Sequence, residues 1–335
     1  MTAYTPGEQP RLPGLVKLNT NENPYPPSPA VAAALSSLNP RDLRLYPDPV
    51  SADVRQAIAR LHGVTPDQVF AGNGSDEILA LCTRAFVEDD GVIGYFDPSY
   101  SLYPVLAAIR NARGSACELT PGFGWPDRDP EPCALFFLAN PNAPTSLAFP
   151  APDIARFCRG FPGVVLIDEA YVDFAPFHCM ELARTLPNVL VMRTLSKSYS
   201  LAGIRFGYAV GSAALIAALF KIKDSYNVDR VTQLVARAAI EDQPHMLGNV
   251  ARIKATRERL AGELRRRGYE VCDSATNFLW TIPGGAAAPA VFAKLKAAGV
   301  LVRYFPGERT GRHIRITIGT DQEVDRLLAV LDGPG

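Results

Sequence analysis

A lysine among small, hydroxylated residues stands out in the segment RTLSKSYSLAGIRFGY, residues 193–208. Lys197 follows the apolar run VLVM, which is typical of a buried strand, and Arg205 comes eight positions later. A lysine at a ligand-binding strand end is suited to forming a Schiff base with a carbonyl compound. Ser196 and Arg205 can both bind an anion, the arginine through two parallel hydrogen bonds. On its own, Lys197 could also be a salt-bridge partner or a surface lysine.

An acid and a tyrosine follow a second apolar run. VVLI is followed by Asp168 and, three residues later, by Tyr171. A carboxylate at the end of a buried strand is unfavourable unless it meets a cation or a hydrogen-bond donor. Asp168 therefore either forms a structural salt bridge or keeps a heterocyclic nitrogen protonated, with the phenol of Tyr171 nearby.

A glycine-containing turn follows the short strand VFAG. Residues 73–77 read NGSDE and lead into a predicted helix, for which Ser75 is the expected N-cap. Backbone N–H groups around Gly74, together with the positive end of the helix dipole, make this turn a candidate phosphate-binding site. An ordinary capped turn explains the same residues.

Taken together, these groups match the requirements of pyridoxal 5′-phosphate. That cofactor needs a lysine for its Schiff base, a carboxylate at its pyridinium nitrogen, donors at its phenolate oxygen and an anion site for its phosphate. The chain supplies a phosphate-binding turn, an aspartate, a tyrosine, a lysine and an arginine in one order along the sequence. The combination is far more specific than any of its members.

The elements that position these residues have the pattern of an α/β protein. The runs GVIGYF, CALFFLANP, VVLIDEAY and VLVMRT are short, nearly continuously apolar and bounded by Gly, Pro or Asp. This pattern predicts strands of a mostly parallel sheet that is buried on both faces. Ligands of such sheets bind beyond the carboxyl ends of the strands, which is where the candidate residues lie.

The pattern changes past about residue 240. A long charged helix, HMLGNVARIKATRERLAGELRRRG, is followed by strands and helices that predict a small α+β domain. We therefore expect an N-terminal arm over residues 1–46, a large cofactor-binding domain over 47–240 and a small C-terminal domain over 241–335. The arm is predicted to join the small domain and a dimer interface.

Composition narrows the class of protein further. The 335 residues carry no net charge, which gives no indication of nucleic-acid or membrane binding. The six cysteines are scattered, so we expect free thiols and no metal site. The polar start is unlike a signal peptide, and no apolar run approaches the ~20 residues that span a bilayer. A cytoplasmic location is predicted.

The chain resembles the fold-type I pyridoxal-phosphate-dependent aminotransferases and, within them, the histidinol-phosphate aminotransferases. The matching motifs lie in order along nearly the whole chain: LNTNENPYPPSP, LYPDP, AGNGSDEIL, DPSYSLY, NPNAPTS, IDEAYVDF, RTLSKSYSLAGIRFGY, SATNF and IRITIGT. The resemblance implies a seven-stranded, mostly parallel central sheet with helices on both faces, plus a small α+β domain.

The resemblance also implies a role for each matching residue. Lys197 would form the Schiff base and then serve as base and acid in the 1,3-proton shift of a ping-pong reaction. Asp168 would keep the pyridine nitrogen protonated, Tyr171 would hydrogen-bond the phenolate oxygen, and Tyr100 would stack on the pyridine ring. The implied phosphate ligands are the backbone N–H groups of Gly74, Ser75 and Asp76, with Ser196 and Arg205.

A homodimer with composite active sites follows from the same resemblance, because Tyr46 in LYPDP matches a tyrosine that reaches the phosphate bound by the other subunit.

One motif departs from the family. The family commonly has N-P-N-N-P-T-G where this chain has NPNAPTS, so Ala143 occupies the position of the usual partner of the phenolate oxygen. We expect Asn142 to take over that contact; otherwise Tyr171 makes it alone. Ser146 replaces the final glycine, and a positive φ there would be mildly strained.

Substrate recognition is assigned to the arm and the small domain. Arg315 matches the arginine that binds the distal anion of the substrate, and Arg303 is the second candidate, because two guanidinium groups suit a dianion. Asn23 and Tyr25 of the arm are expected to close over the substrate. The loop between the two arginines also holds Arg309 and Arg312, and the sequence leaves open which of the loop residues turns inward.

The function implied is amino transfer from histidinol phosphate to 2-oxoglutarate, a step in histidine biosynthesis. Within the same cofactor chemistry, a threonine-phosphate decarboxylase or an aromatic or broad-specificity amino-acid aminotransferase is the alternative. A third hypothesis is a non-catalytic regulatory protein that keeps the fold and binds a ligand without turnover.

Overall fold

The computed structural model describes residues 7–10 and 14–333, and within these ranges the chain forms a seven-stranded, a four-stranded and a two-stranded sheet. The seven strands lie in the order β2 (Val69–Gly72), β8 (Gly207–Gly211), β7 (Val189–Thr194), β6 (Val164–Asp168), β5 (Leu135–Ala139), β3 (Val92–Asp97) and β4 (Arg113–Glu118). β8 runs antiparallel to both of its neighbours, and the other adjacent pairs are parallel. The predicted seven-stranded, mostly parallel sheet is confirmed.

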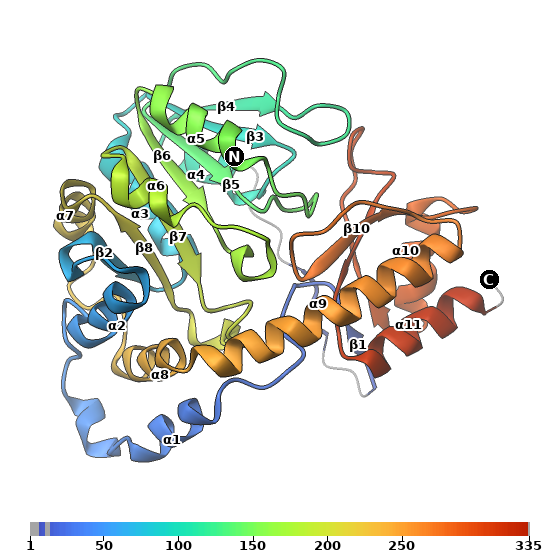
Figure 1. The fold of residues 1–335 in the computed structure, drawn as a ribbon, viewed down its shortest axis with the longest axis horizontal. Helices are drawn as coiled ribbons and strands as arrows, with labels where there is room; N and C mark the ends of the chain where they lie inside the picture. Colours follow the sequence, from blue (N-terminus) through green and yellow to red (C-terminus); the bar gives the residue numbers. More distant parts are fainter. Residues whose placement is uncertain (1–6, 11–13, 334–335) are drawn as a thin grey trace.

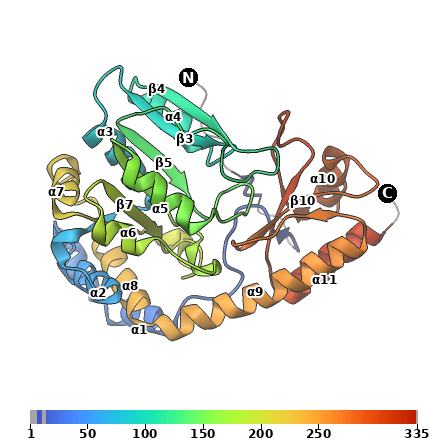
Figure 2. The same cartoon turned by 45° about the horizontal axis from the view of Figure 1, so that its top comes forward.

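Helices cover both faces of this sheet, as Figures 1 and 2 show. Alternate residues of β5 point to opposite faces: Leu135 and Phe137 belong to one apolar cluster, Phe136 and Leu138 to the other. The first cluster is closed by α3 (Ser75–Phe86), α4 (Leu102–Ile109) and α7 (Ala213–Ile222). The second is closed by α2 (Ala52–His62), α5 (Ala151–Gly160), α6 (Met180–Thr185) and α8 (Arg230–Glu241).

The C-terminal part has its own antiparallel sheet. Its strands lie in the order β12 (Arg303–Tyr304), β13 (Ile314–Thr317), β10 (Phe278–Ile282) and β9 (Glu270–Val271). The helices here are α9 (Gln243–Arg266), α10 (Ala288–Ala297) and α11 (Asp321–Asp332). The run VLVRYF, expected as one strand, is split into two: β12 pairs with β13, whereas β11 (Val300–Leu301) pairs with β1 (Val16–Lys17) of the arm.

The arm thus becomes an edge of the small domain through β1 and then runs back to the large domain. There it forms α1 (Pro29–Ser37), which contacts α8. Short 3₁₀ turns complete the described chain at Pro40–Arg44, Pro66–Gln68, Val172–Phe174 and Ala202–Ile204. Residues 1–6 and 11–13 of the predicted arm lie outside the described residues. The domain boundaries at 46 and 240 remain a prediction.

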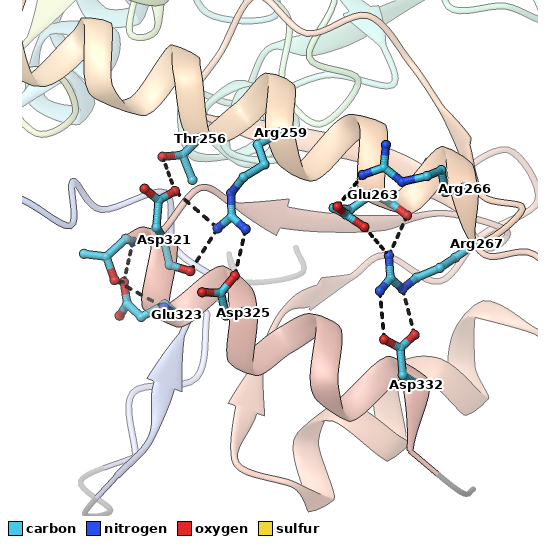
Figure 3. Close-up of polar contacts among 10 residues, drawn as sticks. Thr256, Arg259, Glu263, Arg266, Arg267, Asp321, Glu323, Asp325 and Asp332 are labelled. Carbon is cyan, nitrogen blue, oxygen red and sulfur yellow. Dashed lines mark hydrogen bonds and ion pairs between the residues drawn. The ribbon is translucent and has the colours of Figure 1, made fainter.

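Helix α9 links the two halves of the molecule and is 24 residues long, as the sequence predicted. Charged pairs join it to α11 (Figure 3): Arg259 contacts Asp321 and Asp325, and Arg267 makes two parallel bonds to Asp332 at 2.7 and 2.8 Å. None of the helices in the described ranges combines the length and apolar character that a membrane span requires.

Apolar burial, more than these charged pairs, is expected to hold α9 in place. Leu264 is completely buried, so Leu264→Ala should lower the free energy of unfolding by about 2–5 kcal/mol, measured by urea denaturation. Arg267→Ala, which removes a partly exposed pair, should lower it by about 1 kcal/mol or less. An equal or larger effect of Arg267→Ala would contradict this ranking.

Candidate active site

A cavity of about 800 Å³ lies beyond the carboxyl ends of the parallel strands. Its walls come from the arm, the large domain and the small domain. It brings together most of the residues expected from the sequence: Ser75, Asp76, Tyr100, Asp168, Tyr171, Ser196, Lys197, Arg205, Arg303 and Arg315. The residues expected at the strand ends therefore lie together at one cavity.

The start of α3 forms one end of this cavity. The helix begins at Ser75, and Gly74 takes the N-cap position with φ of 81°. The prediction that Ser75 caps the helix is wrong, because the turn ends one residue earlier in a conformation that favours glycine. Strand β8 passes closely beneath: a Cβ at Gly207 would lie 2.7 Å from the backbone nitrogen of Ser75.

Arg205, two residues before β8, reaches the same place. Its Nη2 lies 3.3 Å from Oδ2 of Asp76, and its Nη1 donates to Oγ of Ser196 at 3.5 Å. A Cβ at Gly74 would lie 2.8 Å from Arg205 Nη2, so a glycine is needed for this approach. Backbone N–H groups, a serine hydroxyl and a guanidinium thus converge, which is the chemistry of a phosphate site.

Asp168 ends β6 and is only 6% exposed. One carboxylate oxygen accepts from the Tyr103 hydroxyl at 2.9 Å, and the other accepts from the Ala170 backbone nitrogen at 3.1 Å. Burial nevertheless raises the pKa of Asp168 to about 6, with the two hydrogen bonds opposing that shift. A bound cationic ring nitrogen would favour its ionised form.

Lys197 follows β7, and its Nζ donates to the Thr20 carbonyl oxygen of the arm at 3.3 Å. The ammonium lies 5.7 Å from the centre of the Tyr171 ring. The Tyr171 hydroxyl in turn accepts from Nδ2 of Asn21 at 2.9 Å. The arm therefore contacts both the lysine and the tyrosine. Tyr100 completes this wall, with its hydroxyl donating to Asp76 Oδ1 at 3.2 Å.

The NPNAPTS loop differs from expectation at Asn142. Its Oδ1 accepts from the Thr145 hydroxyl at 2.8 Å, and its Nδ2 donates to Oγ of Ser99 at 3.3 Å. The neighbouring Ala143, not Asn142, lines the cavity. The geometry thus gives Asn142 a loop-shaping role and does not support its predicted contact with the phenolate oxygen. Ser146 has φ of 67°, as foreseen for a position that is usually glycine.

The small domain contributes two arginines on adjacent strands. Arg303 of β12 and Arg315 of β13 are directly opposite one another, and both line the cavity. Arg315 also donates to the Asn19 carbonyl oxygen at 3.0 Å. The other two candidates lie elsewhere: Arg309 donates to backbone carbonyls of Asp97, Leu119 and Thr120, and Arg312 is exposed.

Three further candidates do not line the cavity. Asn23 donates to the backbone carbonyls of Lys197 and Ser198 at 3.1 and 3.0 Å, which fixes the lysine loop from outside. The ring of Tyr25 lies beneath the guanidinium of Arg252, 3.6 Å from its carbon. Tyr46 is 76% exposed and stacks on Tyr226, away from the cavity of its own chain.

Comparison with known proteins agrees with this geometry. The family described as aminotransferase class I and II matches residues 13–331. The chain belongs to this family. Histidinol-phosphate aminotransferase of Microcystis aeruginosa is 42% identical over 331 residues, with 98% of this chain and 94% of that protein covered. Histidinol-phosphate aminotransferase 1 of Burkholderia pseudomallei is 44% identical over 338 residues, with the same coverage.

A solved structure is similar as well. The histidinol-phosphate aminotransferase of Sinorhizobium meliloti in complex with pyridoxal-5′-phosphate superposes with a TM-score of 0.86 at 28% identity, covering 94% of this chain and 89% of that one. The predicted family and fold are thereby confirmed, and the aminotransferase depends on pyridoxal phosphate.

The residues present in the cavity of the aminotransferase fit this cofactor. Gly74 allows Arg205 to lie close to the start of α3, and Gly207 allows β8 to pack against Ser75. Ser75 and Asp76 at this helix start line the cavity, where a phosphate could bind. Asp168 is a buried acid whose ionised form needs a cation. Lys197 supplies an amine at the same cavity wall.

Sequence reasoning missed two residues of the aminotransferase site. Tyr103 is fully buried, stacks on Phe137 at 4.8 Å and holds the carboxylate of Asp168. It lies three residues after the predicted site residue Tyr100, so one helical turn of spacing was the available signal. Asn21 had no comparable signal, because its contact depends on how the arm folds back.

The buried acid makes the stability of the cofactor-free aminotransferase depend on pH. The folded protein holds the Asp168 proton up to about pH 6, and the unfolded chain releases it near its ordinary pKa. Stability from this group is therefore present at pH 4 and lost as the pH rises through 6. Asp168→Asn should gain about 2–3 kcal/mol over the parent protein between pH 4 and pH 7.5, measured by urea unfolding.

A second variant tests whether the buried carboxyl group of Asp168 causes this pH dependence. Tyr103→Phe removes a hydrogen bond that lowers the Asp168 pKa, so the pH range over which stability is lost should move upward. A difference between Asp168→Asn and the parent protein that stays constant from pH 4 to pH 7.5 would count against the buried charge.

Proposed function

We propose that the aminotransferase transfers the amino group of histidinol phosphate to 2-oxoglutarate, using Lys197, Asp168 and Tyr171 as its central residues. The observation that carries the proposal is the 42–44% identity to curated histidinol-phosphate aminotransferases over 98% of this chain. The paired arginines at the cavity support it independently. Such a reaction places the protein in histidine biosynthesis.

Arg303 and Arg315 are suited to the phosphate of the donor. Like charges directly opposite one another on adjacent strands repel, and a dianion bound between them relieves that repulsion. Guanidinium groups bind phosphate through pairs of charge-assisted hydrogen bonds. The rings of Phe278 and Phe305 lie 5.1 and 5.2 Å from the Arg315 guanidinium carbon and limit its orientations.

Pyridoxal phosphate supplies an aldehyde that exchanges between amines and a ring that withdraws electrons from the substrate carbon. The chain's own residues hold and orient it. Ser75, Asp76, Ser196 and Arg205 would bind its phosphate, and Asp168 would keep a proton on its ring nitrogen. Tyr171 would donate to its ring oxygen, and Tyr100 would pack against the ring.

Lys197 has two tasks in this arrangement. Its nitrogen would bond the cofactor, and its free amine would carry a proton to and from the substrate carbon. The arm limits access of water, because Thr20 and Asn21 lie against Lys197 and Tyr171. Closing a site in this way strengthens each electrostatic contact within it.

A panel of amino donors tests the substrate. Histidinol phosphate added without a keto acid should abolish the visible absorbance band of the bound cofactor, and 2-oxoglutarate should restore it. Histidinol, which lacks the phosphate, is the matched control and should react far more slowly. Arg303→Gln should lower kcat/KM for histidinol phosphate about 10–100-fold and leave that for histidinol nearly unchanged.

Other outcomes of the donor panel would favour one of the alternative functions. Release of CO₂ from O-phosphothreonine, or a preference for phenylalanine or tyrosine over histidinol phosphate, would replace this substrate with one of the alternatives. Binding of the cofactor without turnover of any donor would indicate a regulatory protein. Lys197→Ala should lack the visible band that depends on the lysine.

We propose further that two chains form the functional unit and that Tyr46 completes the site of the partner subunit. Tyr46 is exposed and lies outside the cavity of its own chain, although its motif matches a phosphate-binding tyrosine. Leu43, Leu45 and Val50 beside it are also exposed. An apolar surface of this kind is typical of a protein–protein contact.

Mixing two inactive variants tests the shared site. Lys197→Ala and Tyr46→Ala chains, unfolded together and refolded, form hybrids in which one site has both an intact lysine and an intact tyrosine. Activity should recover to roughly a quarter of the parent value if hybrids form at random. Recovery no greater than the sum of the separate variants would contradict a site built from two chains.

A further inference from the structure

Replacement of the usual asparagine by Ala143 leaves a methyl group at a cavity wall where the family has an amide. Asn142 does not compensate, because Thr145 and Ser99 occupy its amide group. Tyr171 therefore has to provide the hydrogen bond to the cofactor's ring oxygen with less help from its own domain.

An amide from the arm lies at the Tyr171 hydroxyl instead. Nδ2 of Asn21 donates to that hydroxyl at 2.9 Å, and Asn21 is only 1% exposed. Asn21 has φ of 58°, a left-handed conformation that an asparagine tolerates better than most residues. This conformation accompanies the turn of the arm towards Tyr171.

The small domain holds Asn21 in place through three contacts. Its Oδ1 accepts from the Thr317 hydroxyl at 2.9 Å, and its backbone nitrogen donates to the same hydroxyl oxygen at 3.0 Å. Its carbonyl oxygen accepts from Nδ2 of Asn277 at 3.0 Å. With its amide oxygen bound by Thr317, the amide nitrogen of Asn21 is directed at Tyr171.

This contact determines what the Tyr171 hydroxyl can do. A phenol has one proton to donate, and by accepting from Asn21 it keeps that proton for another acceptor. Accepting a hydrogen bond also polarises the O–H group and strengthens the bond that it donates. With the cofactor bound, that acceptor would be its ring oxygen.

We propose that Asn21 is a positioning residue that replaces the missing asparagine of position 143, acting through Tyr171. Because Asn21 is held by Thr317 and Asn277, it couples the small domain to the electronic state of the cofactor. The inference rests on the proposed role of Tyr171 at the ring oxygen.

The test is a pH titration of the visible absorbance of the cofactor-loaded enzyme. A weaker donor at the ring oxygen makes that oxygen more basic, so the proton that it shares with the Lys197 nitrogen is held more tightly. Asn21→Ala should therefore move the titration midpoint upward by about half a pH unit. Thr317→Val, which keeps the shape of the side chain but releases Asn21, should move it in the same direction.

Two further variants make the test specific. Ala143→Asn in the Asn21→Ala background should return the midpoint towards the parent value, because it restores a donor on the large domain. Asn19→Ala is the matched control: it removes an arm amide that donates to the Glu8 carbonyl, and it should leave the midpoint in place. Circular dichroism of each variant verifies folding.

An unchanged midpoint in both Asn21→Ala and Thr317→Val would overturn the inference, and so would a shift that Ala143→Asn fails to reduce. Failure of the proposed function would give a different result. If the parent enzyme has no titrating visible band, or if Lys197→Ala retains it, the assignment of the site itself is at fault.

Discussion

The site depends on how the buried carboxylate of Asp168 is stabilised. An ionised acid that is 6% exposed is unfavourable, and two hydrogen bonds offset only part of that cost, as its raised pKa shows. A cationic ring nitrogen would offset the rest. Strands β6 and β7 are parallel, and Asp168 is paired with Met192, five residues before Lys197. The sheet therefore brings the acid proposed to hold the ring and the amine proposed to react with the cofactor to the same edge.

The arm contacts both the small domain and the reactive residues of the large domain. β1 pairs with β11 of the small domain, and the residues that follow contact Lys197 and Tyr171 of the large domain. The arm thus connects the small domain directly to Lys197 and Tyr171. Arg303 and Arg315 belong to the same small domain, and Arg315 donates to the Asn19 carbonyl oxygen of the arm, so the proposed anion site and the arm are in contact.

Residues that follow apolar strands could be predicted from the sequence, because parallel strands bring their carboxyl ends to one edge. This argument predicted that Asp168, Lys197 and the start of α3 lie near one another, and all three line one cavity. Strand β8 escaped prediction, since GYAVG is short and continues directly from the lysine segment. The contacts of Tyr103 and Asn21 depend on packing between elements, which local patterns do not encode. Because Ala143 stands where the family has an asparagine, Asn142 was expected to contact the ring oxygen instead, but its amide group bonds to Thr145 and Ser99 and it does not line the cavity.

The most direct test of the account is chemical. Borohydride reduction of the cofactor-loaded protein, followed by peptide mapping with mass spectrometry, identifies the lysine that bonds pyridoxal phosphate. The account predicts a single modified peptide that contains Lys197, and no modification when histidinol phosphate has first removed the cofactor from the lysine. Labelling of another lysine, or no labelling of a protein that binds the cofactor, would contradict it.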